Sequence, residues 1–293
     1  MPMPARVYDS PRDDGSRWAE FAFRPGDVVV SAPAKSGTTW SQMICALLLR
    51  GPGEQPVPLG EISPWLDART MPRAEVFAAL EAQPGRRVIK THTPLDGVPV
   101  VPGVHYLVVA RHPLDAAVSL YHQFGNMDRA ELRRRQGRGD GPVPALPPLR
   151  EWLREWIFAD ADPVSVPTGL AGMLHHPAVA WPRRHDENVL LVHYADLSAD
   201  PAGQIRRIAT FLLVEMPDEA MPDLVRATGL DAMRAQADQL ISRALPFRDR
   251  AAFFRSGRSG TGLEAVDAQT LAHYRERAAR LLPAGLSEWL HRP

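Results

Sequence analysis

The chain has 293 residues, of which 45% are hydrophobic and 23% are charged, a composition typical of a globular protein. Its 34 Lys and Arg residues balance its 34 Asp and Glu residues, so the formal net charge is zero. These figures exclude a collagen-like, disulfide-stapled or fully disordered chain. They do not indicate a bulk basic surface for nucleic acid, although a local basic pocket remains compatible with them.

The sequence shows neither a possible internal disulfide nor a signal peptide or membrane helix, and these features indicate the cellular compartment. The chain has one cysteine, Cys45, which cannot form an internal disulfide and whose apolar surroundings predict a core position. The first residues lack the apolar segment of a signal peptide, and no apolar stretch reaches the length of about 18 residues that a membrane helix needs. We therefore expect a cytoplasmic protein with no integral membrane segment.

The first half of the chain alternates between strand and helix patterns. An irregular lead-in over 1–22 precedes a strand at 27–31, a loop at 32–37 and a helix at 38–49, with Thr38 or Thr39 as its N-cap. After a Pro-rich loop, we predict a helix at 73–82, strands at 87–91 and 105–111, and a helix at 113–124. This order favours an α/β fold with three layers, in which helices flank a mostly parallel central sheet.

The second half is less regular. A charge cluster that runs into Gly and Pro at 128–148 favours a solvated helix end and a mobile loop, with a lid over a site as the alternative. Next come a helix at 148–158 with an apolar stripe, a strand at 189–193, a helix at 200–213, a loop at 246–262 and a helix at 264–282. No repeat and no clear linker divides the chain, so we expect one domain over 1–293.

The strand, loop and helix over 28–49 have the composition of an anion site. Backbone N–H groups and the positive end of a helix dipole meet at such a junction, and Lys35 adds a charge. Gly37 allows close approach, and Ser36, Thr38 and Thr39 offer hydroxyl donors. The loop is P-loop-like, but Lys35 precedes Gly37, which is the reverse of a Walker A loop.

Two further strand ends carry polar side chains. Lys90 and His92 stand two residues apart and therefore share a face of a strand, which pairs a cation with a potential general base. Arg111 ends another strand, and Ser119 follows in the next helix. Only two of the 34 basic residues are lysines, Lys35 and Lys90, and both fall in these strand-end segments. No carboxylate stands at the end of 105–111 to organise Mg²⁺, and no metal-ligand spacing occurs, so we expect no metal.

Together these segments resemble the PAPS-dependent sulfotransferases of the cytosolic type. The resemblance lies in APAKSGTTW (32–40), IKTHTP (89–94), VVARHPLDAAVSLYH (108–122), LLVHYADL (190–197) and FFRSGRSG (253–260). Within that family, SPWLD (63–67) and KTHTPLDG (90–97) are most similar to mycobacterial proteins described as glycolipid sulfotransferases. The GC-rich residue usage fits an actinobacterial source.

The resemblance implies a co-substrate, 3′-phosphoadenosine 5′-phosphosulfate (PAPS), a product, adenosine 3′,5′-bisphosphate (PAP), and a set of site residues. Lys35, Ser36, Gly37, Thr38 and Thr39 would hold the 5′-phosphosulfate, with Trp40 near the adenine; Arg111, Ser119, Arg255 and Gly257 would bind the 3′-phosphate, with Ser256 between them; Tyr194, Thr228, Leu230 and Met233 would line the nucleotide. The family has Phe where Leu230 stands, Lys where Ser256 stands and Trp where Gly262 stands.

The implied mechanism assigns catalytic roles to His92, Lys35, Lys90 and Ser119. His92 would be the general base, and the two lysines would stabilise the transition state. A P-loop kinase and a non-catalytic nucleotide-binding relative remain the alternatives. The acceptor stays open: a small hydrophobic hydroxyl compound and a glycolipid both fit, and Trp65, Phe77, Trp152, Trp156 and Trp181 either line an apolar pocket or belong to the core. No dimerisation segment is recognisable, so the oligomeric state stays open too.

Overall fold

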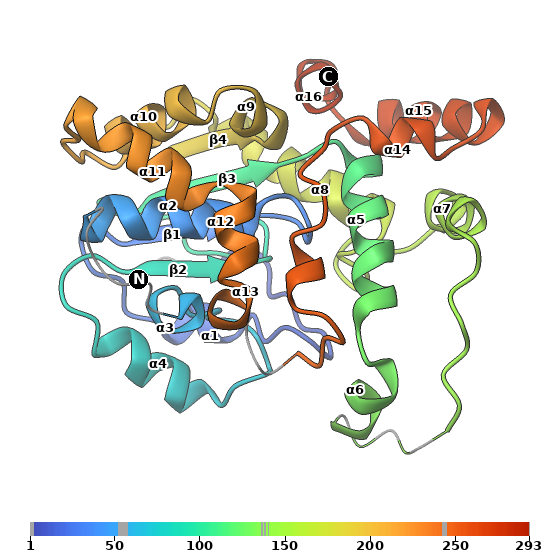
Figure 1. Cartoon of the computed structure of the whole chain (residues 1–293), viewed down its shortest axis with the longest axis horizontal. Coiled ribbons are helices and arrows are strands. Elements are labelled where there is room, and N and C mark those ends of the chain that lie inside the picture. The colour runs from blue at the N-terminus through green and yellow to red at the C-terminus, as the bar shows by residue number, and fades with distance from the viewer. Residues whose placement is uncertain are drawn as a thin grey trace.

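The computed structural model describes residues 3–51, 58–135, 137, 139, 141–241 and 245–292. At its centre lies a parallel sheet whose four strands run in the order β2-β1-β3-β4 (Figure 1). The strands are β1 (Val28–Ser31), β2 (Val88–Thr91), β3 (His105–Ala110) and β4 (Val189–His193). Each lies within the range that the sequence predicts, and the expected three-layer α/β fold is confirmed.

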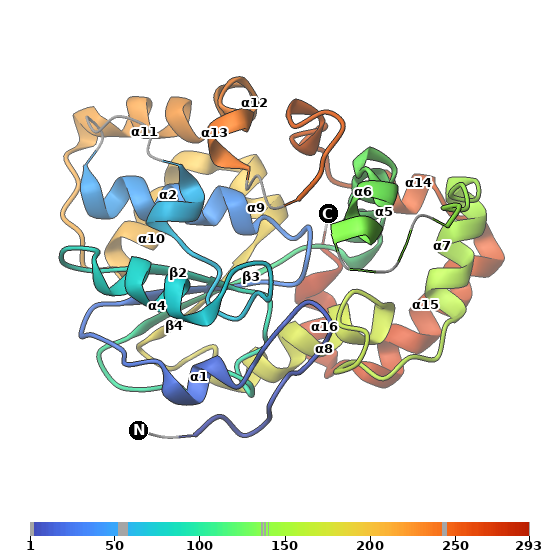
Figure 2. The same cartoon turned by 90° about the horizontal axis from the view of Figure 1, so that it is seen from below.

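The two faces of the sheet are covered by different helices, because neighbouring side chains in a strand point to opposite faces. Val28 and Val30 pack in one apolar cluster with α2 (Thr38–Arg50), α10 (Pro201–Phe211) and α11 (Met221–Thr228). Val29 packs on the other face with α1 (Arg17–Glu20), α4 (Arg73–Glu81) and the end of α8 (Leu170–Ala180). Figure 2 shows the sheet edge-on between these layers. Cys45 is fully buried in the first cluster, as predicted.

A further group of helices packs beyond the carboxyl ends of the strands. Its core joins α5 (Pro113–Asn126), α7 (Leu149–Phe158), α8, α15 (Ala268–Leu281) and α16 (Ala284–Leu290). The predicted stripe of α7 is confirmed, since Leu153, Trp156 and Ile157 are buried. The shorter helices are α3 (Leu59–Ile62), α6 (Arg129–Arg135), α9 (Tyr194–Ala199), α12 (Leu230–Ala235), α13 (Ala237–Leu240) and α14 (Thr261–Glu264).

The lead-in is more ordered than its composition indicates. It is irregular in outline, but Tyr8 and Trp18 are buried and α1 forms within it, because tertiary contacts order residues that carry no periodic apolar pattern.

The segment 128–148 begins with a helix whose residues are all at least partly exposed, α6, in agreement with the predicted solvated helix end. Residues 141–147, here called the strap, run along α5 toward α7 (Figure 1). Residues 136, 138 and 140 of the predicted mobile loop lie outside the described residues.

No helix within the described part of the chain is long and apolar enough to cross a membrane. Among the same residues, no group of three or more His, Cys, Asp or Glu side chains is placed to hold a metal ion.

Candidate active site

The chain order of the strands places a crevice at the carboxyl edge of the sheet. From β1 the chain crosses to β2 on one side and then to β3 on the other, so the loops that follow β1 and β3 diverge between the two strands. A cavity of about 1100 Å³ opens at this edge and is lined by residues that follow all four strands. Its volume is at the upper end of the range of ligand sites, so it can hold a large ligand or two smaller ones.

The loop after β1 takes a conformation that aims backbone N–H groups at the cavity. Lys35 has φ 66° and Gly37 has φ 102°, both left-handed, and α2 begins at Thr38. The expectation that Thr38 or Thr39 caps this helix is wrong: Gly37 holds the N-cap position and provides no side-chain cap. Glycine is required there twice over, because a Cβ would also lie 2.9 Å from the Tyr194 ring. The first N–H groups of α2 therefore keep their capacity to bind an anion.

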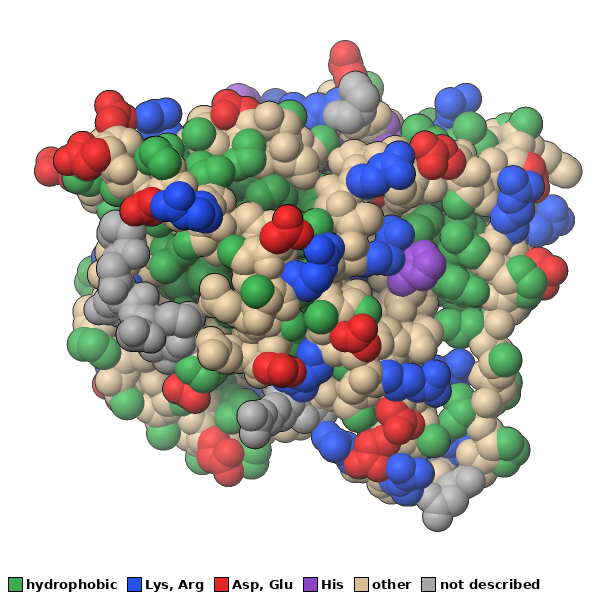
Figure 3. All heavy atoms as spheres, in the orientation of Figure 1, with side chains coloured by type: hydrophobic (Ala, Val, Ile, Leu, Met, Phe, Trp, Pro, Cys, Tyr) green, Lys and Arg blue, Asp and Glu red, His purple; other side chains and the backbone are tan. Residues whose placement is uncertain are grey.

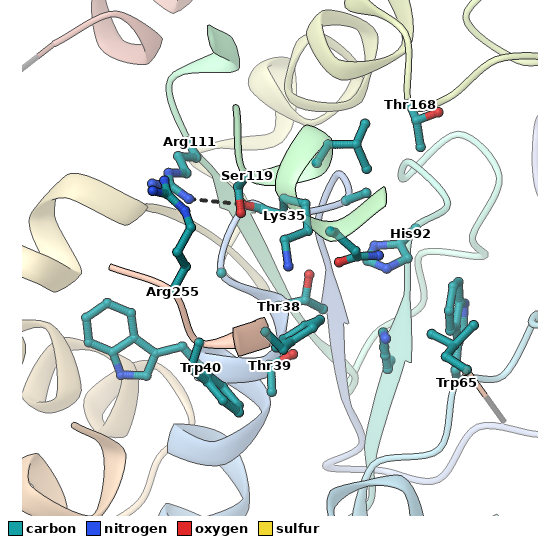
Figure 4. Close-up of a pocket in the computed structure, with 18 of the residues that line it drawn as sticks. Lys35, Thr38, Thr39, Trp40, Trp65, His92, Arg111, Ser119, Thr168 and Arg255 are labelled. Carbon is teal, nitrogen blue, oxygen red and sulfur yellow. Dashed lines mark hydrogen bonds between the residues drawn. The ribbon is translucent and has the colours of Figure 1, made fainter. Parts of the chain in front are cut away.

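Positive charge gathers beside this loop. Lys35 is partly buried, with its Nζ 3.7 Å from the Phe253 ring centre, and loss of hydration together with the charges of Arg111 and Lys90 lowers its pKa to about 7. Arg111 lies 4.2 Å over the Tyr194 ring and donates from Nη2 to the Arg258 carbonyl. Figure 4 shows Arg111 and Arg255 on one side of Lys35, with His92 and Trp65 on the other. Such a cluster is costly without a counter-charge, which indicates an anionic ligand.

Several buried polar atoms around the same space have no hydrogen-bond partner among the described residues. Near Lys35 they are Thr38 Oγ1, Trp40 Nε1, Arg111 Nε and Ser256 Oγ, and on the other side of the cavity Trp65 Nε1 and Gln123 Oε1. Buried polar atoms are nearly always paired in folded proteins. All four atoms near Lys35 belong to groups that can donate, so this wall of the cavity fits a ligand rich in acceptor oxygens or nitrogens.

The imidazole of His92 is held in one tautomer. Its Nδ1 lies 2.6 Å from the Ala32 carbonyl oxygen, which can only accept, so Nδ1 carries the proton and Nε2 keeps a lone pair. Burial and the charges of Lys90 and Arg12 hold the pKa of His92 well below 6.5. The ring meets Trp65 edge-on at 4.7 Å, and Lys90 Nζ lies 4.1 Å from the centre of the same indole. Burial is also the main cause that lowers the pKa of Lys90 to about 8. A neutral histidine at ordinary pH is a competent proton acceptor.

A buried carboxylate fixes the backbone that presents His92. Asp67 Oδ2 accepts hydrogen bonds from Thr91 Oγ1 at 2.6 Å and Thr93 Oγ1 at 2.7 Å, which flank His92 on either side. It also accepts from Trp18 Nε1 at 2.8 Å. Thr91 Oγ1 in turn accepts from the Thr93 N–H. Asp67 is therefore a positioning residue that acts through the two threonines.

For a reaction in which His92 accepts a proton, this arrangement predicts that Thr93→Val lowers kcat about tenfold, because small displacements of a proton acceptor are costly. Valine keeps the shape of threonine and removes one donor to Asp67. Trp18→Phe is the matched control: it removes another donor to the same oxygen, yet Trp18 does not border His92. Both variants should lose roughly 1–3 kcal/mol of unfolding free energy. Equal kcat values for the two variants in steady-state assays would refute the positioning role.

The loop near the end of the chain is clamped to α5. Asp115 accepts from the N–H groups of Gly260 and Gly262 at 2.9 and 2.7 Å and from the Thr261 hydroxyl at 3.2 Å. A Cβ at Gly262 would lie 2.4 Å from the Leu114 backbone, so no side chain fits there. The family's tryptophan is thus replaced here by direct contact between α14 and α5. This clamp positions Arg255, Ser256 and Gly257 at the cavity wall.

The structure brings nearly all the predicted site residues together. The residues that line the cavity are Lys35, Gly37, Thr38, Thr39, Trp40, Lys90, His92, Arg111, Ser119, Tyr194, Thr228, Leu230, Met233, Arg255, Ser256 and Gly257. Ser36 does not: it is buried behind the loop, where its N–H donates to the Pro33 carbonyl. Of the five aromatic residues considered for the pocket, Trp65 lines the cavity, and the other four pack in the apolar clusters of the fold.

The lead-in supplies lining residues that the sequence pattern does not reveal. Arg12 and Asp13 line the cavity on the side of His92 and form an ion pair, with Arg12 Nε 3.1 Å from an Asp13 oxygen. Thr168 lines the same side. No motif marks these positions, because the lead-in reaches the cavity only through its docking on the sheet domain: the Arg6 N–H donates to the Asp96 carbonyl, and Tyr8 Oη to the Asp96 carboxylate.

Comparison with known proteins agrees with this geometry. The family model described as "Sulfotransferase domain" matches residues 25–269. The glycolipid sulfotransferase of Mycobacterium bovis is 37% identical over 318 aligned positions, which cover 99% of this chain and 95% of that protein. Its Mycobacterium tuberculosis counterpart is also 37% identical, over 317 positions with the same coverage. Dog sulfotransferase 1B1 is 26% identical over 228 positions, 73% of this chain and 68% of that protein.

Solved structures share the fold at lower identity. Mouse sulfotransferase SULT7A1, complexed with PAP, matches with a TM-score of 0.70 at 21% identity, over 94% of this chain and 90% of that one. A retinol dehydratase in complex with retinol and PAP matches with a TM-score of 0.68 at 20% identity, over 92% and 85% of the two chains.

Proposed function

Because this chain belongs to the sulfotransferase family, we propose that it transfers a sulfuryl group from PAPS to a hydroxyl of a glycolipid or a similar, largely apolar acceptor. The relatives that are 37% identical over nearly the whole chain are named glycolipid sulfotransferases, which supports the acceptor class. The neighbours of known structure that share the fold were solved with PAP, which supports the donor.

PAPS would fit the wall of the cavity that carries the cationic side chains and the hydrogen-bond donors that have no partner among the described residues. Lys35, the N–H groups at the start of α2 and the hydroxyls of Thr38 and Thr39 would hold the 5′-phosphosulfate, and Arg111, Ser119, Arg255, Ser256 and Gly257 the 3′-phosphate. Trp40, Tyr194, Thr228, Leu230 and Met233 would line the nucleoside. Ser36 would contribute through the backbone of the loop, since its side chain is turned away from the cavity. Trp40 Nε1 and Arg111 Nε are buried donors that have no partner within the described part of the chain, and a polyanionic nucleotide would supply acceptors for both.

The catalytic roles fall on the opposite wall and on the lysine between the walls. PAPS supplies the sulfuryl group and leaves as PAP. His92 Nε2 accepts the proton of the acceptor hydroxyl. Lys35 neutralises charge on the departing phosphate, Lys90 stabilises the sulfuryl oxygens, and Ser119 restrains Lys35. The observation that carries the proposal is a neutral imidazole, with its Nε2 lone pair available, lining one cavity with two partly buried lysines.

The proposal also covers the domain organisation of the chain, its location and its source. The chain would act as one domain, since loops from both halves of the sequence line the same cavity. A cytoplasmic location is supported by the single buried cysteine. An actinobacterial source is supported by the mycobacterial relatives.

The test is transfer of radiolabelled sulfate from PAPS to a panel of hydroxyl compounds that includes glycolipids, phenols and steroid alcohols. We expect a labelled sulfate ester with glycolipids, formed with added chelator as well as without it. Binding of PAP without transfer to any hydroxyl would instead indicate a non-catalytic relative. Mg²⁺-dependent turnover of ATP with no use of PAPS would indicate a P-loop kinase.

A further inference from the structure

A second cavity, of about 730 Å³, lies beside the first. We call it the side chamber. Its walls are one side of α5, the start of α6 and the strap. The lining is largely apolar, with Tyr121, Phe124, Gly125, Met127, Ala130, Pro142, Val143, Pro144, Ala145 and Leu146, and with polar His122, Arg129 and Arg248. Figure 3 shows the opening between the strap and the body of the molecule.

Two hydrogen bonds tie the strap to the helices beside it. Arg129 Nη1 donates to the Pro144 carbonyl at 2.9 Å, and Tyr121 Oη donates to the Pro147 carbonyl at 2.9 Å. The two bonds fix the middle of the strap and its end next to α7. Because proline lacks an N–H and restricts the backbone, Pro142, Pro144 and Pro147 also make this wall stiff. The side chamber thus lies between α5 and a strap that hydrogen bonds and prolines hold in place.

The side chamber adjoins the cavity that contains His92, because Phe124 and Met127 line both spaces. On the main cavity side, α5 presents Leu120, Gln123, Phe124 and Met127, which are spaced as one stripe of a helix. This stripe begins one residue after Ser119 and leads to the end of α5, where Met127 turns the chain toward α6.

We propose that the side chamber holds the aliphatic chain of the acceptor whose hydroxyl lies at His92. This inference rests on the proposed function and deepens it, because it requires an acceptor that combines a hydroxyl-bearing head with a long apolar tail. An aliphatic chain suits the lining: the apolar side chains form most of the wall, while the Arg129 guanidinium is engaged with the strap. Each methylene moved from water into such surroundings improves binding about fourfold.

The test uses alkyl glycosides that share one sugar head and differ only in chain length. The unmodified protein should show a KM that falls steadily as the chain grows. Gly125→Leu fills the side chamber, since a Cβ at this exposed position of α5 points toward Leu146 Cδ1, 3.8 Å away, and Gly125 does not line the main cavity. Gly60→Leu is the matched control, also a helical glycine, with nothing within 4 Å of its Cβ.

We expect Gly125→Leu to raise the KM for the long-chain glycoside at least tenfold, to near the value for the short one, while Gly60→Leu keeps the chain-length dependence. A KM that does not depend on chain length in the unmodified protein, or an unchanged dependence in Gly125→Leu, would overturn this inference alone if the short glycosides are still sulfated. If no hydroxyl compound is sulfated although PAP binds, the proposed function itself fails. PAP affinity and thermal unfolding of each variant show whether a lost rate reflects lost folding.

Discussion

His92→Asn should lower kcat by roughly 10²–10⁴-fold, as much as His92→Ala does, because both remove the nitrogen that takes the acceptor proton. The asparagine variant is the sharper of the two. Its side-chain NH₂ group can replace Nδ1–H as the donor to the Ala32 carbonyl, which lies 2.6 Å from Nδ1. It therefore preserves the contact that holds the side chain and removes only the base.

The measurement is the single-turnover rate with saturating donor and acceptor, together with the affinity for PAP. His185→Ala, which changes an exposed histidine outside the cavity, controls for loss of an imidazole as such. Retention of more than a tenth of the rate in His92→Asn would remove His92 as the base.

The pH dependence of the rate follows from the same residue. The neutral form of His92 is the active one, so on the acid side the rate falls as the pH drops through the pKa of His92. Since burial, Lys90 and Arg12 hold that pKa well below 6.5, kcat should show no acid decline from pH 7.5 down through 6.5 and should decline at lower pH. An acid limb centred at or above pH 6.5 would contradict the lowered pKa.

Lys35→Arg should lower kcat by roughly 10²–10³-fold although it keeps the positive charge. Lys35 Nζ is a compact charge in a partly buried position 3.7 Å from the Phe253 ring. A guanidinium is planar, larger and spreads its charge over three nitrogen atoms, so it cannot take the same place at a single oxygen atom. PAP affinity should fall much less than kcat, since the charge itself remains. A full rate in Lys35→Arg would contradict the point-charge role.

Proton uptake gives an independent test of Lys35. With a pKa of about 7, Lys35 is mostly neutral at pH 8 in the free protein. A bound anion favours the charged form and raises this pKa, so binding of PAP must take up protons at pH 8, and affinity must decline as the pH rises above 7. Calorimetric titrations of PAP in buffers of different ionisation enthalpy measure the uptake. Lys35→Arg should take up fewer protons, because arginine stays charged throughout.

The sequence predicts those parts of the molecule in which a strand pattern is followed directly by residues that can bind an anion or move a proton. Val28, Val29 and Val30 form a β-branched run that becomes the central strand β1. Lys35 and Arg111 follow strands, Lys90 lies near the end of β2, and since the strands are parallel, their carboxyl ends meet at one edge. The site therefore emerges from the strand pattern together with the residue types, without knowledge of the helices.

The parts that escape prediction depend on contacts between distant segments. Arg12 and Asp13 reach the cavity because the lead-in docks through Tyr8 and Trp18, and neither residue belongs to a periodic pattern. Ser36 has a donor hydroxyl, like its neighbours, but the left-handed backbone of the loop turns it behind the cavity wall. The role of Asp67 depends on three partners, from α1 and from both sides of His92, that only the folded chain brings together.

The hydrogen bonds from residues 260–262 to Asp115 have a consequence for the binding and release of the nucleotide. Three donors share one carboxylate, so removing that carboxylate breaks all three hydrogen bonds at once, while Arg111 and Arg234 still hold the carbonyls of Phe254, Arg255 and Arg258. Asp115→Ala should therefore loosen residues 260–262 without altering any residue that lines the cavity. We expect this variant to release PAP faster, which would make a position outside the cavity a determinant of how long the spent product stays bound.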